Sequence, residues 1–429
     1  MSELSFIEKL LDGVEVEWKT VAEVFKLRNG YTPSKSNKEF WENGTVPWFR
    51  MDDIRENGRI LDDSLQKIST AAVKGGRLFP ANSIIMATSA TIGEHALIKV
   101  PFLSNQRFTC LTVSKDYAEL LDIKFLFYYC FLLADWCKKN TTMSSFASVD
   151  MDGFKRFMIP IPCPDNLEKS LEIQSEIVRI LDTFTELTAE LTAELTAELT
   201  ARKKQYSYYR DQLLSFEEGE VEWKPLSGIG EFIRGKRFTK ADYVDEGISV
   251  IHYGEIYTRY GTFTDRAFSK VPCDMANSLR YAEPGDVVIA GVGETVEDVG
   301  KAVAWLGNEK VAIHDDSYAF RHSMNPKFIS YLMQTAAFID EKAKHVSQGK
   351  VNRLLINGIA KVRIPVPYPD DAEQSMAEQA RIVAVLDKFD TLTNSISEGL
   401  PREIELRQKQ YEYYRDLLLS FPKSGKEAA

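Results

Sequence analysis

Three short segments carry residue types that other proteins use to hold nucleotides or bases. Residues 230–236 have the glycine and lysine spacing of a phosphate-binding loop, but Arg237 stands where Ser or Thr would ligate magnesium. Gly291-Val292-Gly293 follows an apolar run, as in dinucleotide-binding folds, but Val296 replaces the third glycine. We therefore expect a basic turn at Arg234–Arg237, able to touch phosphates, and a tight turn at Gly291–Gly293.

The third segment, Asn325-Pro326-Lys327-Phe328, resembles the tetrapeptide with which adenine methyltransferases hold a flipped base, but Lys327 replaces its second proline. Asn325 and Pro326 instead suit the cap and first turn of a helix, which we predict over Lys327–Lys344. The five histidines form no HExxH or HxxxH pattern, and there is no GxSxG elbow. The sequence therefore predicts no catalytic residue and no metal site, which disfavours a self-sufficient DNA methyltransferase or nuclease.

The composition is that of a folded protein with more than one domain. The chain has 429 residues, 44% of them hydrophobic, and exceeds the size at which a single core keeps growing. Its five cysteines are scattered and never spaced as CxxC, which fits a reducing compartment. The longest apolar run, Phe125–Ala134, is about half a bilayer span, and no signal-peptide pattern is present. We expect a cytoplasmic protein that does not enter a membrane.

The net charge of −10 argues mildly against DNA binding by the chain alone, because DNA-binding proteins displace counterions with a basic face. Residues 1–165, however, hold 20 Lys and Arg against 21 Asp and Glu. This stretch is near neutral and can still present a basic face, so charge leaves DNA binding open.

Much of the chain occurs twice, at a constant shift of 205 residues. Residues 174–216 align without gaps to residues 379–421, and 22 of the 43 positions are identical. The same shift relates further segments, namely Val16–Lys19 to Val221–Lys224 and the Ile-Pro-Ile-Pro of Ile159–Pro162 to the Ile-Pro-Val-Pro of Ile364–Pro367. Each copy therefore has a variable part followed by a shared part.

The shared parts predict long helices, because apolar residues recur at spacings of three and four. In the first copy these are Ile177, Ile180, Leu181, Phe184, Leu187, Leu191, Leu195 and Leu199. Two such helices in one chain can pair antiparallel, and Gly399-Leu400-Pro401 is expected to kink or break the second. The variable parts hold short β-type runs such as Ser83–Met86 and Asp286–Ala290, separated by turn residues.

The predicted fold class is α+β. Two mixed α/β heads are separated by two long, antiparallel, coiled-coil-like helices, and the whole has an internal pseudo-twofold repeat. We expect head 1 at residues 1–165, a helical spacer at 166–216, head 2 at 217–370, a second helical spacer at 371–421 and a tail at 422–429.

The tetrapeptide Thr-Ala-Glu-Leu occurs three times in succession within the first helical spacer, from Thr188 to Leu199. A solvated spacer helix with a stripe of Leu191, Leu195 and Leu199 explains its composition. Each unit advances the helix by one turn plus about 40° and by about 6 Å. B-DNA turns by about 36° per base pair, so one unit would re-phase two DNA-reading heads by about one base pair. We hypothesise that the tract is a ruler for the spacing of two half-sites.

Together these features resemble the specificity subunits of type I restriction-modification enzymes. The resemblance rests on the two Pro-rich strands and the helices that follow them, which contain Ile177–Asp182 and Ile382–Asp387. It also rests on the helix ends at 205–216 and 410–421, which share the form Gln-Tyr-x-Tyr-Tyr-Arg-Asp-x-Leu-Leu-Ser-Phe. It covers essentially the whole chain, and the repeated tetrapeptide is similar to that of the type IC subgroup.

The resemblance implies that each head is a target-recognition domain that reads one half of an asymmetric, bipartite site in double-stranded DNA. The helices would set the spacing and dock two methyltransferase subunits, and restriction subunits would join through them. S-adenosylmethionine, ATP and magnesium would act in those partners, so no cofactor is expected in this chain. The chain itself would be a non-catalytic subunit.

Direct readout of DNA requires side chains that reach base edges, often from loops. The candidates in head 1 are Asn29, Tyr31, Lys35, Thr88, Ser89, Asn105, Gln106 and Arg107. The counterparts in head 2 are Arg234, Lys236, Arg237, His252, Tyr253, His314, Asp315 and Tyr318. The alternative function is a helical scaffold or adaptor whose duplicated heads bind proteins and not DNA.

Overall fold

The computed structural model describes residues 6–142, 147–217, 221–394 and 399–422. They form two compact units: unit 1 contains residues 1–191 and 407–429, and unit 2 contains residues 192–406. Each unit therefore combines one head with helical segments from both copies of the repeat. Of the expected tail, residues 423–429 lie outside the described part of the chain, as do residues 218–220 and 395–398 within the other expected segments.

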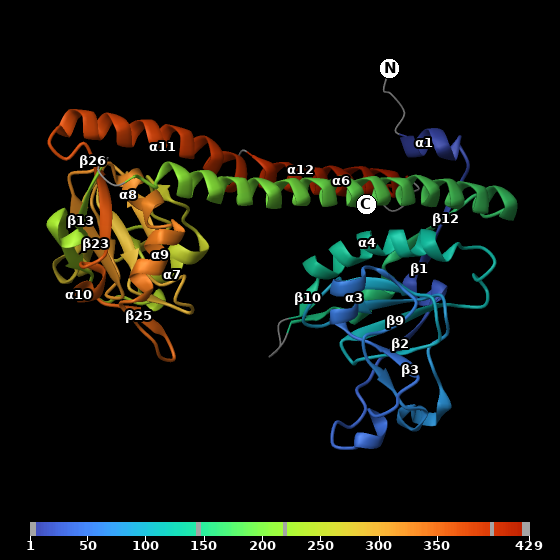
Figure 1. Cartoon of the computed structure of the whole chain (residues 1–429). Coiled ribbons are helices and arrows are strands. Elements are labelled where there is room, and N and C mark those ends of the chain that lie inside the picture. The colour runs from blue at the N-terminus through green and yellow to red at the C-terminus, as the bar shows by residue number, and fades with distance from the viewer. Residues whose placement is uncertain (1–5, 143–146, 218–220, 395–398, 423–429) are drawn as a thin grey trace. The chain divides into compact units, whose positions relative to one another are not determined.

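A five-stranded sheet forms the centre of head 1 (Figure 1). Its strands, in order across the sheet, are β2 (Phe25–Asn29), β9 (Phe108–Val113), β6 (Ser83–Ala87), β7 (His95–Ile98) and β4 (Ile60–Leu61). Neighbours pair antiparallel, except for β4 and β7, which are parallel. Strand β6 confirms the β-type run predicted at residues 83–86.

Head 2 contains a sheet of the same topology. Its strands, in the same order, are β14 (Gly230–Arg234), β23 (Ser317–His322), β19 (Val287–Ala290), β21 (Ala302–Trp305) and β16 (Phe263–Thr264). The one parallel pair is again at the edge, between β16 and β21. The duplication therefore extends to the folds of the heads, whose sequences differ.

The central strands are apolar throughout because both faces of each sheet are covered. Successive side chains of a strand point to opposite faces. In β6, Ile84 and Met86 belong to one core, which includes the helix α4 (Ile123–Lys139), whereas Ile85 and Ala87 belong to a second core. In β19, Val287 and Ile289 are separated from Val288 and Ala290 in the same way.

A second sheet in each head carries a parallel strand pair that will position the candidate site. In head 1 its order is β5 (Lys67–Ile68), β3 (Val46–Phe49) and β8 (Leu103–Ser104), with β3 and β8 parallel. In head 2 the order is β17 (Ser269–Val271), β15 (Ile248–Ile251), β22 (Val311–Ile313) and β18 (Tyr281–Ala282), with β15 and β22 parallel.

The remaining strands form small sheets. They are β1 (Val16–Thr20) with β12 (Met158–Pro162), β10 (Thr141–Thr142) with β11 (Ser148–Val149), β13 (Val221–Pro225) with β26 (Arg363–Pro367), and β20 (Val292–Gly293) with β25 (Asn352–Leu354) and β24 (Val346–Ser347). The repeated Pro-rich segments are β12 and β26, which pair with the repeated Val-Glu-Trp-Lys segments in the same register. The expected tight turn at Gly291–Gly293 was wrong, because Val292 and Gly293 lie in β20.

Short helices complete the heads. In head 1 they are α1 (Phe6–Leu11), α2 (Val21–Val24), α3 (Met51–Asn57) and α5 (Met151–Arg156); in head 2 they are α7 (Tyr253–Thr258), α8 (Pro326–Leu332), α9 (Ala336–Ala343) and α10 (Ile356–Ile359). No helix in the described ranges combines the length and the apolar composition needed to cross a membrane.

The helix predicted over Lys327–Lys344 is two helices, α8 and α9. The predicted start is right, because the Asn325 side chain accepts the backbone N–H groups of Lys327 and Phe328. Thr335 breaks the segment: it has an extended backbone, and its hydroxyl accepts the backbone N–H of Phe338 and caps α9.

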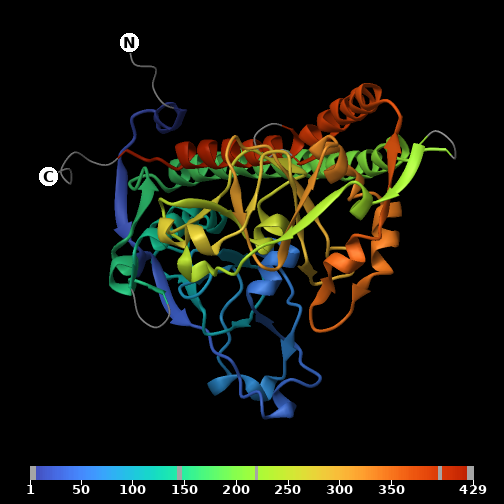
Figure 2. The same cartoon turned by 90° about the vertical axis from the view of Figure 1, so that its left-hand side faces the viewer.

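Three long helices follow the heads: α6 (Leu167–Leu213), α11 (Ala372–Asn394) and α12 (Leu400–Leu418). The break expected near residues 399–401 is present, because α12 begins at Leu400, directly after Gly399, whose φ is +105°. In unit 1 the start of α6 lies alongside the end of α12 in both views, so the two helices run antiparallel (Figures 1 and 2). The predicted fold class is confirmed.

An equivalent Phe–Tyr pair joins the long helices in each unit. In each pair, the Phe comes from one copy of the repeat and the Tyr from the other. In unit 1, Phe184 of α6 packs on Tyr414 of α12, with ring centroids 6.2 Å apart. In unit 2, Phe389 of α11 packs on Tyr209 of α6, at 5.7 Å. Phe389 and Tyr414 are the repeats of Phe184 and Tyr209 at the shift of 205, so the two units contain the same contact between equivalent residues of the two copies.

The repeated Gln and Asp residues join each head to its long helix. In unit 1, Gln174 accepts the backbone N–H of Asp122 at 2.8 Å, and Asp182 binds Lys124 Nζ and the Tyr128 hydroxyl, both at 2.7 Å. In unit 2 the contacts recur: Gln379 accepts the backbone N–H of Asn325 at 2.8 Å, and Asp387 binds Lys327 Nζ and the Tyr331 hydroxyl at 2.7 Å. The motif on which the family resemblance rests therefore anchors the heads.

Candidate nucleic-acid interface

Two turns of three residues occupy corresponding places in the two heads. The first, Asn105–Arg107, connects β8 to β9, and the second, His314–Asp316, connects β22 to β23. Each turn leaves the end of a parallel strand pair, beside the start of α3 in head 1 and of α7 in head 2. We call them the 105–107 turn and the 314–316 turn.

Backbone hydrogen bonds hold the two turns in the same way. In head 1 the N–H of Asn105 donates to the carbonyl of Phe49 at 3.1 Å, and the N–H of Thr88 donates to Arg107 at 3.0 Å. In head 2 the equivalent bonds are His314 to Ile251 at 3.3 Å and Gly291 to Asp316 at 2.8 Å. The side chain of the first residue also makes the same contact in both turns. Asn105 Oδ1 accepts the N–H of Arg107 at 3.0 Å, and His314 Nδ1 accepts the N–H of Asp316 at 3.1 Å.

A glycine directly after a neighbouring strand, Gly30 after β2 and Gly235 after β14, lets the backbone approach each turn. A Cβ at Gly30 would lie 2.2 Å from the carbonyl oxygen of Asn105, and a Cβ at Gly235 would lie 2.1 Å from that of His314. No other residue fits at these two positions. The glycines place Tyr31 and Lys236 at equivalent points, where their N–H groups donate to Ser104 at 2.8 Å and to Ile313 at 3.1 Å.

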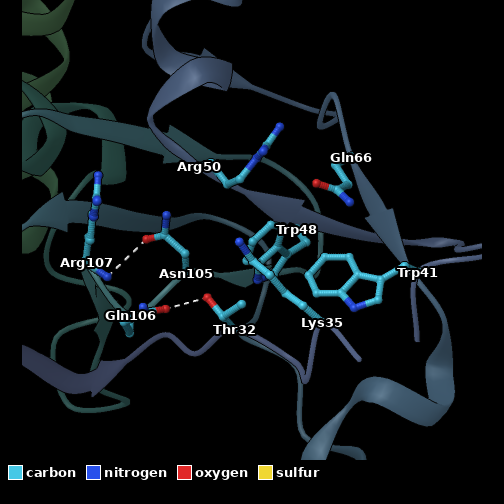
Figure 3. Close-up of a pocket in the computed structure, with 9 residues that line it drawn as sticks. All are labelled: Thr32, Lys35, Trp41, Trp48, Arg50, Gln66, Asn105, Gln106 and Arg107. Carbon is cyan, nitrogen blue, oxygen red and sulfur yellow. Dashed lines mark hydrogen bonds between the residues drawn. The ribbon is translucent and has the colours of Figure 1, made fainter. Parts of the chain in front are cut away.

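In head 1 the turn lines an open cleft of about 480 Å³ (Figure 3). The lining residues are Thr32, Lys35, Trp41, Trp48, Arg50, Gln66, Asn105, Gln106 and Arg107. The lining includes two indole rings, those of Trp41 and Trp48, with centroids 5.1 Å apart and planes at 81°. Three lining side chains are cations and none is a carboxylate, so the cleft is suited to a negatively charged or electron-rich ligand.

Four of the eight candidates in head 1 line this cleft: Lys35, Asn105, Gln106 and Arg107. The other four lie beside it and serve the structure. Tyr31 donates its hydroxyl to the carbonyl of Ala72 at 3.0 Å, and Asn29 and Thr88 both bind the hydroxyl of Thr109. Ser89 forms a β-bridge with Ser148.

The eight candidates of head 2 gather around the 314–316 turn. Arg234, Lys236 and Arg237 are exposed, Arg234 as the last residue of β14 and the other two in the segment that follows it. The expected basic turn was wrong, because the backbone leaves β14 without turning at these residues. His252 and Tyr253 begin α7, and their rings lie 4.4 Å and 5.2 Å from that of His314. Tyr318 is buried in β23, where its ring packs over Gly291.

The two histidines of this cluster are neutral at neutral pH. Burial lowers the pKa of His252 to about 4, and the neighbouring His314 adds to the effect. Burial also lowers the pKa of His314, although Asp315 and Asp316 act in the opposite direction. Both side chains therefore offer uncharged ring nitrogens.

His314, Asp315 and Asp316 bring three potential metal-ligand atoms within 4.8 Å of one another. Two of them are already engaged: His314 Nδ1 accepts a backbone N–H, and the Asp316 carboxylate pairs with Arg353 at 3.2 Å. The Asp315 carboxylate lies 3.2 Å from the same nitrogen of His314. The arrangement is that of a braced turn.

The four spacer candidates all lie on α6, divided between the units. Thr188 and Leu191 line a shallow groove of about 210 Å³ between α6 and α12 in unit 1. Leu195 is buried and Leu199 is half-buried in unit 2.

Five lining residues of the head 1 cleft were missed by sequence reasoning: Thr32, Trp41, Trp48, Arg50 and Gln66. Arg50 had a detectable signal, because it stands directly before a helix whose third residue, Asp53, accepts its backbone N–H at 2.6 Å. His252, which was selected, stands in the same relation to Glu255 at 3.1 Å. The two tryptophans are far from the turn in sequence and carried no such signal.

The family described as "Type I restriction modification DNA specificity domain" matches residues 13–201 and 218–406. The chain is 53% identical over 411 residues to the type I restriction enzyme EcoprrI specificity subunit of Escherichia coli, covering 93% of both proteins. It is 36% identical over 460 residues to the EcoR124I/EcoR124II specificity subunit of Escherichia coli, covering 99% of this chain and 98% of that protein.

A solved chain from work on complex assembly and conformational transition of the type I R-M system has the same fold. The TM-score is 0.63 at 16% identity, covering 94% of this chain and 97% of the other. The repeated segments, the duplicated heads and these likenesses agree. The chain therefore belongs to the family of type I restriction-modification specificity subunits, which are non-catalytic.

Proposed function

We propose that head 1, at residues 1–165, and head 2, at residues 217–370, are target-recognition domains that each read one half of an asymmetric bipartite site in double-stranded DNA. The observation that carries the proposal is the pair of corresponding turns. They share backbone geometry but carry Asn-Gln-Arg in head 1 and His-Asp-Asp in head 2. A duplicated scaffold with different side chains at the same place is suited to a site whose halves differ in sequence.

The sixteen candidate residues divide between two roles in this proposal. Those with exposed polar groups, such as Lys35, Gln106 and Arg107 in head 1 and Lys236 and Arg237 in head 2, contact bases or phosphates. The others, such as Asn29 and Tyr318, support the backbone from which those side chains project.

The helical spacers at 166–216 and 371–421 set the distance between the heads and dock two methyltransferase subunits, through which restriction subunits join. The most exposed large apolar side chains support this: Tyr413 is 64% and Tyr208 is 60% exposed. They occupy the same position of the two copies, so each offers an equivalent contact to one of two identical partners.

S-adenosylmethionine, ATP and magnesium belong to the partner subunits in this proposal. The segments of this chain that resemble nucleotide-binding loops do not fit such ligands. Gly230–Arg234 is strand β14, and Val292–Gly293 is strand β20, and neither leads into a helix that points its amide groups at a phosphate. Basic surface on the partners would also reconcile the net charge of −10 with DNA binding.

A map of adenine methylation tests the proposal. Genomic DNA is sequenced from cells that carry the methyltransferase partner, with and without this chain. We expect a split motif with a fixed gap only when the chain is present. If both maps are the same while the complex is assembled, the chain does not direct methylation, and a scaffold that binds proteins is the better explanation.

A further inference from the structure

The 105–107 turn presents hydrogen-bond donors. An amide side chain has one acceptor oxygen and two N–H donors. Both amide oxygens are used inside head 1, since Asn105 Oδ1 accepts the N–H of Arg107 and Gln106 Oε1 accepts the hydroxyl of Thr32 (Figure 3). The groups that face the cleft are therefore the amide N–H groups and the guanidinium of Arg107.

The residues around the 105–107 turn add further donors and positive charge. The other charged residues that line the cleft are Lys35 and Arg50, and both are cations. Among the described residues, no carboxylate binds Lys35 or Arg107. A ligand that enters the cleft thus meets donors and positive charge on several sides.

The 314–316 turn presents an acceptor at the position of Gln106. Asp315 stands there, and its ionised carboxylate only accepts hydrogen bonds. Its side chain is 34% exposed, and one carboxylate oxygen lies 3.2 Å from His314 Nδ1. That nitrogen already accepts the N–H of Asp316 and so donates no hydrogen bond to Asp315. Arg234 Nε donates to the backbone oxygen of Asp315 at 2.9 Å and braces the turn without engaging the carboxylate. Asp316, at the position of Arg107, is paired with Arg353.

The base edges in the major groove also divide into those that accept hydrogen bonds and those that donate them. Guanine offers two acceptors, O6 and N7, to which Arg and other donors bind. Cytosine N4 and adenine N6 are amino donors, and an Asp carboxylate accepts from the amino group of cytosine.

We infer that Gln106 and Arg107 specify a guanine in the half-site of head 1, whereas Asp315 specifies a base with an amino group, cytosine or adenine, in the half-site of head 2. The inference rests on the proposed reading of DNA by the heads. It adds which residues discriminate and which class of base each of them selects.

The test compares methylation motifs of the complete complex with variants of the full chain. Arg107→Ala and Gln106→Ala are expected to relax one guanine position in one half-site, with specific over nonspecific binding falling roughly tenfold to a hundredfold. Asp315→Asn is expected to relax one cytosine or adenine position in the other half-site. In each case the second half-site stays unchanged.

A polarity reversal sharpens the test. Gln106→Glu keeps the size of the side chain but replaces its N–H donors with acceptors. The preference at its position should move from guanine towards cytosine or adenine. If guanine is still preferred there, Gln106 does not read it.

Exposed residues of the same heads provide matched controls. Lys99→Ala in head 1 and Asp274→Asn in head 2 should leave both half-sites intact. Copurification with the methyltransferase verifies that each variant folds, and the backbone bonds of the turns do not involve the exchanged side-chain groups. If the unaltered chain directs no split motif, the proposed function fails; if it does, and the three substituted positions leave the motif unchanged, only this inference is overturned.

Discussion

Single side chains show why the repeated motif has been kept in both copies of this sequence. Asp387 and Asp182 each accept a lysine and a tyrosine from the helix of a head, so one carboxylate fixes the head to the long helix. The surroundings differ: Lys327 is 20% exposed, and its ammonium lies 3.5 Å from the centre of the Phe263 ring, whereas Lys124 is 38% exposed. The contact in unit 2 is therefore the less screened of the two.

Replacing Asp387 tests this difference. Asp387→Asn removes the charge that Lys327 requires and should lower the free energy of unfolding by about 1–2 kcal/mol. Asp182→Asn should have a smaller effect, because water screens its more exposed partner. Urea denaturation of the full chain measures both, with Glu373→Gln, an exposed residue in the first turn of α11, as the control. A larger loss for Asp182→Asn would contradict the argument.

The buried side chain of His95 makes the stability of unit 1 depend on pH. It is fully buried beside Phe131, with ring centroids 4.5 Å apart, and burial lowers its pKa to about 3. Since its pKa in the unfolded chain is about 6.5, the stability from its neutral form is complete above pH 6.5. It is lost progressively as the pH falls towards 3, because the unfolded chain takes up the proton first.

His95→Leu should therefore change the acid response of unit 1. At pH 7 the variant loses the hydrogen bond to the Gly93 carbonyl and is less stable by about 1 kcal/mol. Between pH 6.5 and pH 4 the difference should shrink and then reverse, because only the unaltered chain loses stability as its unfolded form takes up the proton. Denaturation midpoints across this range measure it, and two parallel curves would contradict the assignment.

Elements were predictable where a pattern is local and periodic. The long helix α6 and the strands β6 and β19 follow from apolar spacing alone, and Asn325, as an N-cap residue, predicts the start of α8. Thr335 was not recognised as the start of a new helix, because a threonine also occurs inside helices and only its extended backbone distinguishes the cap. Four of the residues that line the head 1 cleft, Lys35 and Asn105–Arg107, were selected from the sequence as polar loop residues. Trp41 and Trp48 reach the cleft only through the tertiary fold.

The repeated tetrapeptide gives a prediction for one element. Deleting Thr192–Leu195 brings Leu199 to the place of the buried Leu195, so the apolar stripe of α6 is preserved while the helix loses about 6 Å and about 40° of rotation. We expect the gap of the recognised DNA site to change by about one base pair and both half-sites to stay the same. Glu194→Gln, which keeps the length, should leave the gap unaltered. A methylation map gives the gap for both variants. An unchanged gap after the deletion would falsify the hypothesis that the tract sets the spacing of the half-sites.

At the scale of the molecule, each unit is completed by a helix from the other copy of the repeat. Unit 1 buries Leu418, Leu419 and Phe421 from the second copy in the core of head 1, and unit 2 buries Tyr206 and Leu214 from the first copy in the core of head 2. The sequence revealed the duplication, but which copy packs on which head depends on contacts between residues far apart in the chain, such as Phe125 with Phe421 and Tyr209 with Phe389, which periodicity does not report.

Two equivalent docking positions should behave independently. Tyr208→Ala is expected to weaken the binding of one methyltransferase subunit and Tyr413→Ala that of the other, by about 1–2 kcal/mol each, as for an exposed aromatic residue that becomes buried in an interface. Native mass spectrometry of the assembled complex should give mainly one bound methyltransferase in each single variant and mainly none in the double variant. Ser207→Ala is the neighbouring control, and full occupancy in the double variant would exclude this surface.

The scaffold of the two turns has a consequence for how such a protein can diversify. Gly30, Gly235 and the backbone bonds hold the 105–107 and 314–316 turns, and Asn105, His314 and Asp316 brace them, so the side chains of Gln106, Arg107 and Asp315 can be exchanged with little effect on folding. Folding stability and sequence preference are thus nearly uncoupled at these positions, and a library randomised there should be rich in folded members. New specificities are then within reach of a few substitutions in one half of the gene, while the other half-site is inherited unchanged.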